Sequence, residues 1–199
     1  MKPTLLFTSG DPAGIGPRAV VRALTGREVR AACEPILVGE RAVWKRAGWR
    51  PGLAALLDTG LGGKVPDYGR PTAQSGRMSF VALNVALRLA ARRLAGGIVT
   101  APISKTAWAM AGLPYRDHTE YFREQTQATN VQMILGLPAR KIWSVVATRH
   151  VPLAQVSRLL TRDRLLDAAR GLRDALRSWG ITRPQLGLCG FNPHAGEEK

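Results

Sequence analysis

The sequence predicts an α/β fold. Short apolar runs of strand length alternate with helical patterns, and polar or glycine-rich turns directly follow several of these runs. The 199 residues, 45% of them hydrophobic, have the composition of a globular chain that is long enough to bury a sizeable core. We expect one domain, or one and a half.

Six apolar runs have the length of β-strands, and helical patterns separate several of them. In chain order the runs are Leu5 to Thr8, Ile36 to Val38, Ile98 to Thr100, Val131 to Leu135, Ile142 to Ala147 and Leu186 to Cys189.

Two longer stretches predict helices that pack on the core. The clearer one runs from about Thr161 to Trp179, where Gly180 is placed to stop it, and the other lies near Ser79 to Ala95. Their apolar faces carry Leu165, Ala169, Leu172, Leu176 and Trp179 in the first helix, and Phe80, Leu83, Leu87, Ala91 and Leu94 in the second. The Gly- and Pro-rich region 50–76 is either a long surface connection or an excursion toward a second subdomain.

The formal net charge of +15 raises nucleic-acid binding as a hypothesis. However, the basic residues are spread singly along helical stretches, where acidic residues interleave with them, as in Arg164, Asp167, Arg170, Arg173, Asp174 and Arg177. That pattern indicates a solvated helix face, so we expect no nucleic-acid partner, and attraction of a small anionic substrate is a secondary consequence.

The cellular compartment is predicted from the absence of a membrane-spanning or signal-peptide segment in the sequence. No window approaches the roughly 18 apolar residues of a membrane span, and Asp11 and Pro12 interrupt any signal-peptide core. We therefore expect a cytoplasmic protein without a membrane partner. The two cysteines, Cys33 and Cys189, are expected to be free buried thiols, with a disulfide disfavoured.

The first strand runs into a glycine-rich turn at residues 9–17, and a helical pattern with Pro17 at its start follows. Such a turn points backbone amides at whatever lies there. Gly14, Gly16 and Ala19 satisfy the degenerate dinucleotide fingerprint, in which Glu40 would be the ribose-binding acid. A purely structural turn is an equally good interpretation.

Four further polar segments are candidates for chemistry, at residues 100–105, 117–122, 148–153 and 190–197. The chain has three histidines, and each lies in one of these segments: His118, His150 and His194. Because imidazole binds metals and titrates near neutrality, this placement favours a chemical role over a structural one.

The segments GDPAGIGP, TAPISK, HTEYF, Thr-x-His-x-Pro-Leu and NPHAGE follow one another in this order between Gly10 and Glu197. Together they resemble the ordered motif set of the 4-hydroxythreonine-4-phosphate dehydrogenase family of pyridoxal phosphate biosynthesis. The resemblance implies the three-layer fold of isocitrate and isopropylmalate dehydrogenases, a homodimer, NAD or NADP, and a divalent metal such as Zn, Mg or Co. The substrate would be a small phosphorylated hydroxy amino acid.

Carried over residue by residue, the resemblance implies that His118 and Thr119 contact substrate, and that His150 and His194 are two of three metal-binding histidines. Lys105 lies in a motif near the cleft without an assigned role. The implied reaction is metal-assisted oxidation of 4-phosphohydroxy-L-threonine to a 3-keto acid that then loses its carboxylate.

Three departures from the family pattern stand out. Arg18 and Asp117 stand where the family has an acidic residue and a glycine, respectively, and the sequence stops after Lys199 whereas family members continue. We therefore expect residues 1–199 to be the N-terminal and central part of a two-domain enzyme whose C-terminal segment is missing, and this chain itself to be inactive or incomplete.

Two alternative functions stay open. One is a dehydrogenase of another 4-phosphorylated four-carbon hydroxy acid, such as threonate or erythronate phosphate. The other is a non-catalytic remnant that serves as a binding or dimerisation module.

Overall fold

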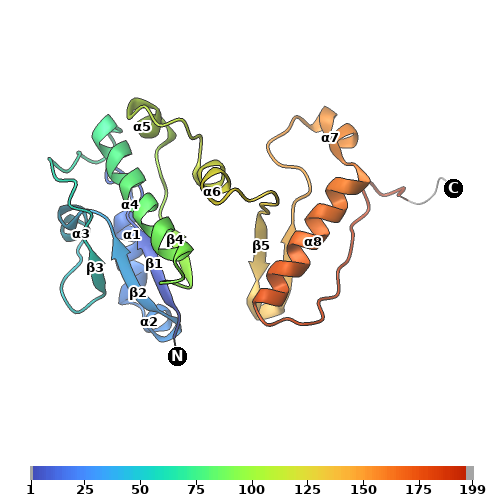
Figure 1. The fold of residues 1–199 in the computed structure, drawn as a ribbon, viewed down its shortest axis with the longest axis horizontal. Coiled ribbons are helices and arrows are strands. Elements are labelled where there is room, and N and C mark those ends of the chain that lie inside the picture. The colour runs from blue at the N-terminus through green and yellow to red at the C-terminus, as the bar shows by residue number, and fades with distance from the viewer. Residues whose placement is uncertain (1, 196–199) are drawn as a thin grey trace. The chain divides into compact units, whose positions relative to one another are not determined.

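A computed structural model describes residues 2–195 of the chain (Figure 1). It divides into two compact units, Met1–Gln125 and Thr126–Lys199. They are called unit 1 and unit 2 below, and each is described by itself. Within the described residues, no helix is long and apolar enough to cross a membrane.

Unit 1 is built on a parallel sheet of four strands in the order β3-β2-β1-β4. The strands are β1 (Thr4–Thr8), β2 (Glu34–Val38), β3 (Ala55–Leu57) and β4 (Gly97–Thr100). In register, Phe7 of β1 lies between Leu37 and Val99. Three of these strands were predicted from apolar runs, whereas β3 was not.

Helices cover both faces of this sheet. The helices are α1 (Gly16–Thr25), α2 (Arg27–Ala32), α3 (Arg41–Arg46), α4 (Ala73–Ala91), α5 (Lys105–Met110) and α6 (His118–Thr126), of which α5 and α6 pack against α4. Successive strand residues point to opposite faces. Accordingly, Phe7 packs in one cluster with Leu24 of α1 and Trp44 of α3, whereas Leu6 packs in another with Ala82 of α4. This helix–sheet–helix layering confirms the predicted fold class.

The predicted helix at Ser79 to Ala95 is α4, but α4 begins six residues earlier. A reciprocal pair of hydrogen bonds between Thr72 and Ser75 caps its start. Gly76, which counted as a loop residue in the sequence, lies where α4 crosses α5, and a Cβ there would overlap the Ala107 carbonyl. The glycine therefore allows the two helices to approach closely.

The Gly- and Pro-rich region 50–76 stays within unit 1. It contributes β3 to the sheet, passes through the loop at residues 58–72 and ends in the first turn of α4. The hypothesis of an excursion toward a second subdomain is therefore wrong for this region.

Among its described residues, unit 2 contains an antiparallel hairpin and two helices. Its elements are β5 (Ile134–Leu137), the 3₁₀ turn η1 (Pro138–Arg140), β6 (Ile142–Val145), α7 (Leu153–Leu159) and α8 (Arg162–Ser178). The helix α8 matches the prediction, with Thr161 as its cap and Gly180 beyond its end at φ 88°. Leu172 and Leu176 of α8 are buried, whereas Trp179, which was expected on the same face, is 56% exposed.

Two expectations for unit 2 are corrected. The run Leu186 to Cys189 forms no strand, because no described strand pairs with it and Leu188 is 78% exposed. The predicted strand Val131 to Leu135 begins later, at Ile134. Both cysteines are free thiols, as predicted, but only Cys33 is buried, since Cys189 lies in the exposed final segment.

Candidate functional site

The glycine-rich turn at residues 9–17 lies at the carboxyl end of β1, where open α/β sheets bind ligands. Gly10 has φ 61°, and a Cβ there would overlap the Pro102 carbonyl. The Asp11 amide donates to that same carbonyl at 2.9 Å, and the Asp11 carboxylate accepts from the Ala13 amide at 2.9 Å. The turn is thus fixed by its own side chain and by the loop after β4.

The dinucleotide fingerprint does not fit this geometry. Both carboxylate oxygens of Glu40 are used inside the protein, by the Thr59 hydroxyl and by the amides of Leu61 at 2.9 Å and Gly62 at 3.1 Å. A Cβ at Gly16 would lie 3.0 Å from the Cβ of Ala101, so this glycine is explained by internal packing. The structural interpretation of the turn is therefore favoured, and we derive no cofactor contact from it.

The loop after β4 lies at the same end of the sheet, because β1 and β4 are parallel neighbours and their carboxyl ends point the same way. The Ser104 hydroxyl caps α5 by accepting from the Ala107 amide at 3.1 Å. Lys105 is the first residue of α5 and is exposed. Two of the sequence motifs are therefore brought together at one edge.

The third motif begins α6 at His118. Asp117 caps this helix, since its Oδ1 accepts from the Glu120 amide at 2.9 Å, and Glu120 in turn accepts from the Arg116 amide at 2.6 Å. The departure at Asp117 is therefore compatible with an intact helix start. Arg18, the other substituted position, is exposed on α1.

The His118 imidazole packs among aromatic rings. Its centroid lies 5.9 Å from the Trp108 ring at 73° and 6.3 Å from the Phe122 ring at 24°. Its Nε2 is buried and has no hydrogen-bond partner among residues 2–195. Burial lowers the pKa of His118 below 6.5, although the nearby Asp117 carboxylate opposes the shift. Burial thus favours the neutral form of the ring, and Thr119 beside it is partly exposed.

These aromatic neighbours were not predicted as part of the site. Phe122 follows His118 by four residues, so helical spacing contained a signal for it. Trp108 comes from a different helix, and no local pattern indicates its contact with His118.

Unit 2 contains the two histidines that were predicted to bind metal. Both side chains are exposed, and His150 has φ 52°, a left-handed conformation that is uncommon for a non-glycine residue. The His194 amide donates to the Asn192 side chain at 2.9 Å. Within the described residues, no group of three His, Cys, Asp or Glu is placed to hold a metal, so the fit is partial and we derive no step through a metal.

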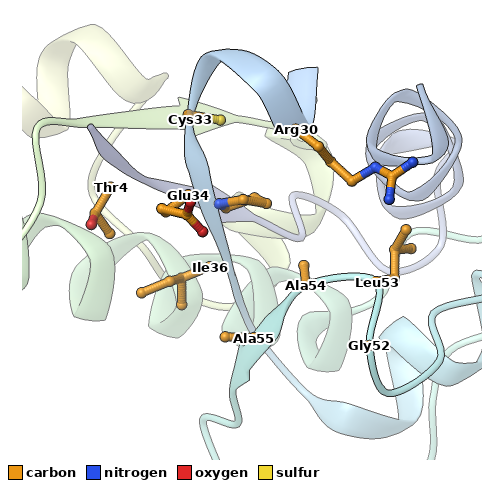
Figure 2. Close-up of a pocket in the computed structure, with 10 residues that line it drawn as sticks. Thr4, Arg30, Cys33, Glu34, Ile36, Gly52, Leu53, Ala54 and Ala55 are labelled. Atoms are coloured by element: carbon orange, nitrogen blue, oxygen red, sulfur yellow. The ribbon is translucent and has the colours of Figure 1, made fainter. Parts of the chain in front are cut away.

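A pocket of about 540 Å³ lies elsewhere in unit 1 (Figure 2). It is lined by the amino-terminal ends of β1 and β2, by Arg30 and Cys33, and by residues 52–55. The predicted site residues do not line this pocket. It lies at the amino-terminal end of the strands, whereas the motif loops lie at the carboxyl end.

Comparisons with known proteins place these motifs in a family. The sequence profile of the family described as "Pyridoxal phosphate biosynthetic protein PdxA" matches residues 31–199. A Symbiobacterium thermophilum protein named "Putative D-threonate 4-phosphate dehydrogenase" is 33% identical over 98% of this chain and 64% of its own length. A 4-hydroxythreonine-4-phosphate dehydrogenase of a Synechococcus strain is 34% identical over 99% of this chain and 63% of its own length.

A solved structure has the same fold. The crystal structure of a 4-hydroxythreonine-4-phosphate dehydrogenase from Burkholderia phymatum superimposes with a TM-score of 0.88 at 28% identity, covering 99% of this chain and 65% of that one. The chain thus spans slightly less than two thirds of the length of these relatives.

Proposed function

Because the chain belongs to the PdxA family of pyridoxal phosphate biosynthetic proteins, we propose that it serves the oxidation of 4-phosphohydroxy-L-threonine. The carbon that bears the 3-hydroxyl gives a hydride to NAD or NADP, the hydroxyl loses its proton, and the resulting 3-keto acid loses its carboxylate as carbon dioxide. When bound, a nicotinamide would supply the hydride acceptor, and a divalent ion such as Zn, Mg or Co would favour loss of the hydroxyl proton.

The observation that carries the proposal is the state of His118. Its imidazole packs against Trp108 and Phe122, burial lowers its pKa, and it lies at the start of a helix beside Thr119. A neutral ring and a hydroxyl hydrogen-bond a polar substrate without adding charge, and the packed aromatic rings limit the orientations of the imidazole. We propose His118 and Thr119 as substrate contacts on this basis.

We further propose that His150 and His194 each supply an imidazole to the metal. The left-handed backbone of His150 supports this, because strained residues cluster at functional sites. Two imidazoles make a weak chelate, since metal sites of this kind use three or more protein ligands. For these 199 residues alone we therefore expect weak metal binding and no measurable NAD reduction.

A second candidate is oxidation of D-threonate 4-phosphate, which the name of the Symbiobacterium thermophilum relative favours. The two substrates share the phosphate and the 3-hydroxyl but differ in the group on the second carbon, which is an amine in one and a hydroxyl in the other. The described residues do not separate them.

Binding to His118 tests the proposal without requiring turnover. In the 199-residue chain, imidazole NMR signals are assigned by comparison with the H118Q variant, and each phosphate is titrated separately. We expect 4-phosphohydroxythreonine to shift the His118 signal selectively, and D-threonate 4-phosphate to do so more weakly. The reverse order would establish the second candidate, and absence of a His118 shift with both compounds would refute both assignments.

Steady-state NAD reduction with the same phosphates and added divalent metal is the companion experiment. We expect none from the chain. Turnover within the usual enzyme range of roughly 1 to 1000 per second would show that two imidazoles suffice and that the chain is catalytic by itself. A chain that neither turns over nor binds either phosphate would instead match the non-catalytic alternative.

A further inference from the structure

The short helix α3 is joined at its amino end to the loop after β3. The Asp58 carboxylate accepts from the Arg41 amide at 3.1 Å and from the Arg41 guanidinium at 3.0 Å. Glu40, the residue before α3, binds the hydroxyl of Thr59 and the amide of Leu61. Residues 58–69 are called the strap below, and these contacts fix its first half.

Arg46, the last residue of α3, joins the second half of the strap to the glycine-rich turn. Its Nη1 donates to the Pro66 carbonyl at 2.6 Å, and its Nη2 donates to the Pro12 carbonyl. The guanidinium also lies 4.1 Å from the centroid of the Tyr68 ring. Next to Tyr68, the Gly69 amide donates to the Ala13 carbonyl at 2.8 Å. One side chain thus contacts two segments that are more than fifty residues apart in sequence.

Arg46 forms no ion pair with any of the described residues, 2–195. Its side chain is half-buried, and its Nε has no hydrogen-bond partner within the same range. A partly buried guanidinium that donates to two carbonyls is better explained by geometry than by charge pairing, because its planar fork directs donors to two separate acceptors.

The contacts continue from the turn to the loop after β4. Asp11, the neighbour of Pro12, donates its amide to the Pro102 carbonyl at 2.9 Å. Two residues further on, Ser104 caps α5. The turn is therefore held from two sides, by Arg46 on the strap side and by Pro102 on the side of β4.

We propose that Arg46 is a positioning residue, which fixes the turn at residues 10–16 against the loop that carries residues 100–105. It acts through the Pro12 and Pro66 carbonyls and the Tyr68 ring, and it touches no reacting atom. The inference rests on the proposed function only in taking the carboxyl ends of β1 and β4, where open α/β sheets bind ligands, as part of the substrate site.

Amide hydrogen exchange measured by mass spectrometry on the 199-residue chain tests the proposal. We expect R46Q to speed exchange by about one order of magnitude in peptides that cover residues 10–16 and 64–69, because two hydrogen bonds from a charged group are lost. A smaller increase is expected at residues 102–107. Peptides from β1 and β2 should keep their wild-type exchange. K45Q, at an exposed residue of the same helix, is the matched control.

Conservative variants separate positioning from general stabilisation. R46K keeps the charge but should fail to restore protection, since an ammonium does not reproduce the fork. Y68F keeps the ring under the guanidinium and should match the wild type, whereas Y68L should lose part of the protection at residues 64–69.

The outcomes exclude one another. Unchanged exchange at residues 10–16 in R46Q, or full restoration by R46K, would overturn the proposal. So would faster exchange throughout unit 1 in proportion to a lower melting temperature, because that result marks a merely structural residue. None of these readouts uses substrate, so failure of the proposed function leaves them interpretable.

Discussion

The two units differ in how much of their apolar surface they bury. Unit 1 has a four-stranded parallel sheet between helices and three clusters of buried side chains. Unit 2 places one long helix against a two-stranded hairpin, and its buried apolar residues among those described are Ala168, Leu172 and Leu176. Of the seventeen large hydrophobic residues that are exposed among residues 2–195, ten lie in unit 2, including Leu135, Leu137 and Ile142 of the hairpin.

Because of this difference, a motif recognised in the sequence has a well-defined geometry in only one of the two units. The motifs of unit 1 lie on loops whose backbone and side chains contact a packed core, as His118 contacts Trp108. The motifs of unit 2 lie on exposed segments, and a two-stranded hairpin contributes little stability by itself. The same kind of sequence signal therefore leads to a defined side-chain environment in unit 1 and to a weakly constrained one in unit 2.

Truncating one buried side chain in each unit tests this contrast between the two cores. Trp108 is fully buried and donates its indole N–H to the Ser79 hydroxyl at 2.8 Å. We expect W108A to lower the free energy of unfolding of unit 1 by about 3–5 kcal/mol, and L172A to lower that of unit 2 by about 2 kcal/mol. Urea unfolding followed by NMR signals from β1 and β6 measures the two separately. An equal loss of unfolding free energy in both variants would contradict the difference between the two cores.

The next effect concerns pH. Because the pKa of His118 lies below 6.5 in the folded chain, the unfolded chain binds more protons between the folded value and 6.5. The stability of unit 1 should therefore rise with pH through that window and should fall as the pH drops below 6.5. Urea midpoints measured between about pH 5 and 8 check this. A wild-type slope that persists in H118Q would assign the dependence to another group.

Smaller changes in stability are expected from two acidic residues that contact arginines, Asp58 in unit 1 and Asp174 in unit 2. Partial burial would raise the pKa of Asp58, but hydrogen bonds from the Arg41 and Gly60 amides and from the Arg41 side chain outweigh it and lower the pKa. We expect D58N to cost unit 1 from a few tenths to about 1 kcal/mol, because the hydrogen bond from the Arg41 amide weakens and solvent screens the ion pair. D174N breaks the fully exposed pair with Arg173 in unit 2 and should leave its melting temperature unchanged. A larger loss in D174N would contradict this ranking.

Local sequence patterns predicted the elements in which apolar residues form a strand-length run or recur with the period of a helix. The strand at Leu5 to Thr8 and the helix after Thr161 are examples. The three-residue strand β3 escaped prediction because it lies among glycines and prolines and is defined by its pairing with β2. The run at Leu186 failed for the opposite reason, since apolar residues form a strand only where another strand pairs with them.

In the candidate site, too, sequence patterns missed the features that depend on partners distant in the sequence. The order of the motifs identified His118, and the structure places this residue at the start of α6. The roles of Glu40 and Arg46 depend on partners 19 to 34 residues away, so their local sequence contains no signal for them. Charged side chains that serve a distant loop are therefore the residues that sequence patterns miss.

The left-handed backbone of His150 has a consequence for selection. Glycine adopts that conformation without steric cost, and asparagine tolerates it better than most side chains do. A library randomised at position 150 and enriched only for folded chains should therefore fill with glycine and asparagine. One enriched for retention on an immobilised divalent metal should keep histidine, and the ratio between the two enrichments would measure how far function opposes stability at a single codon.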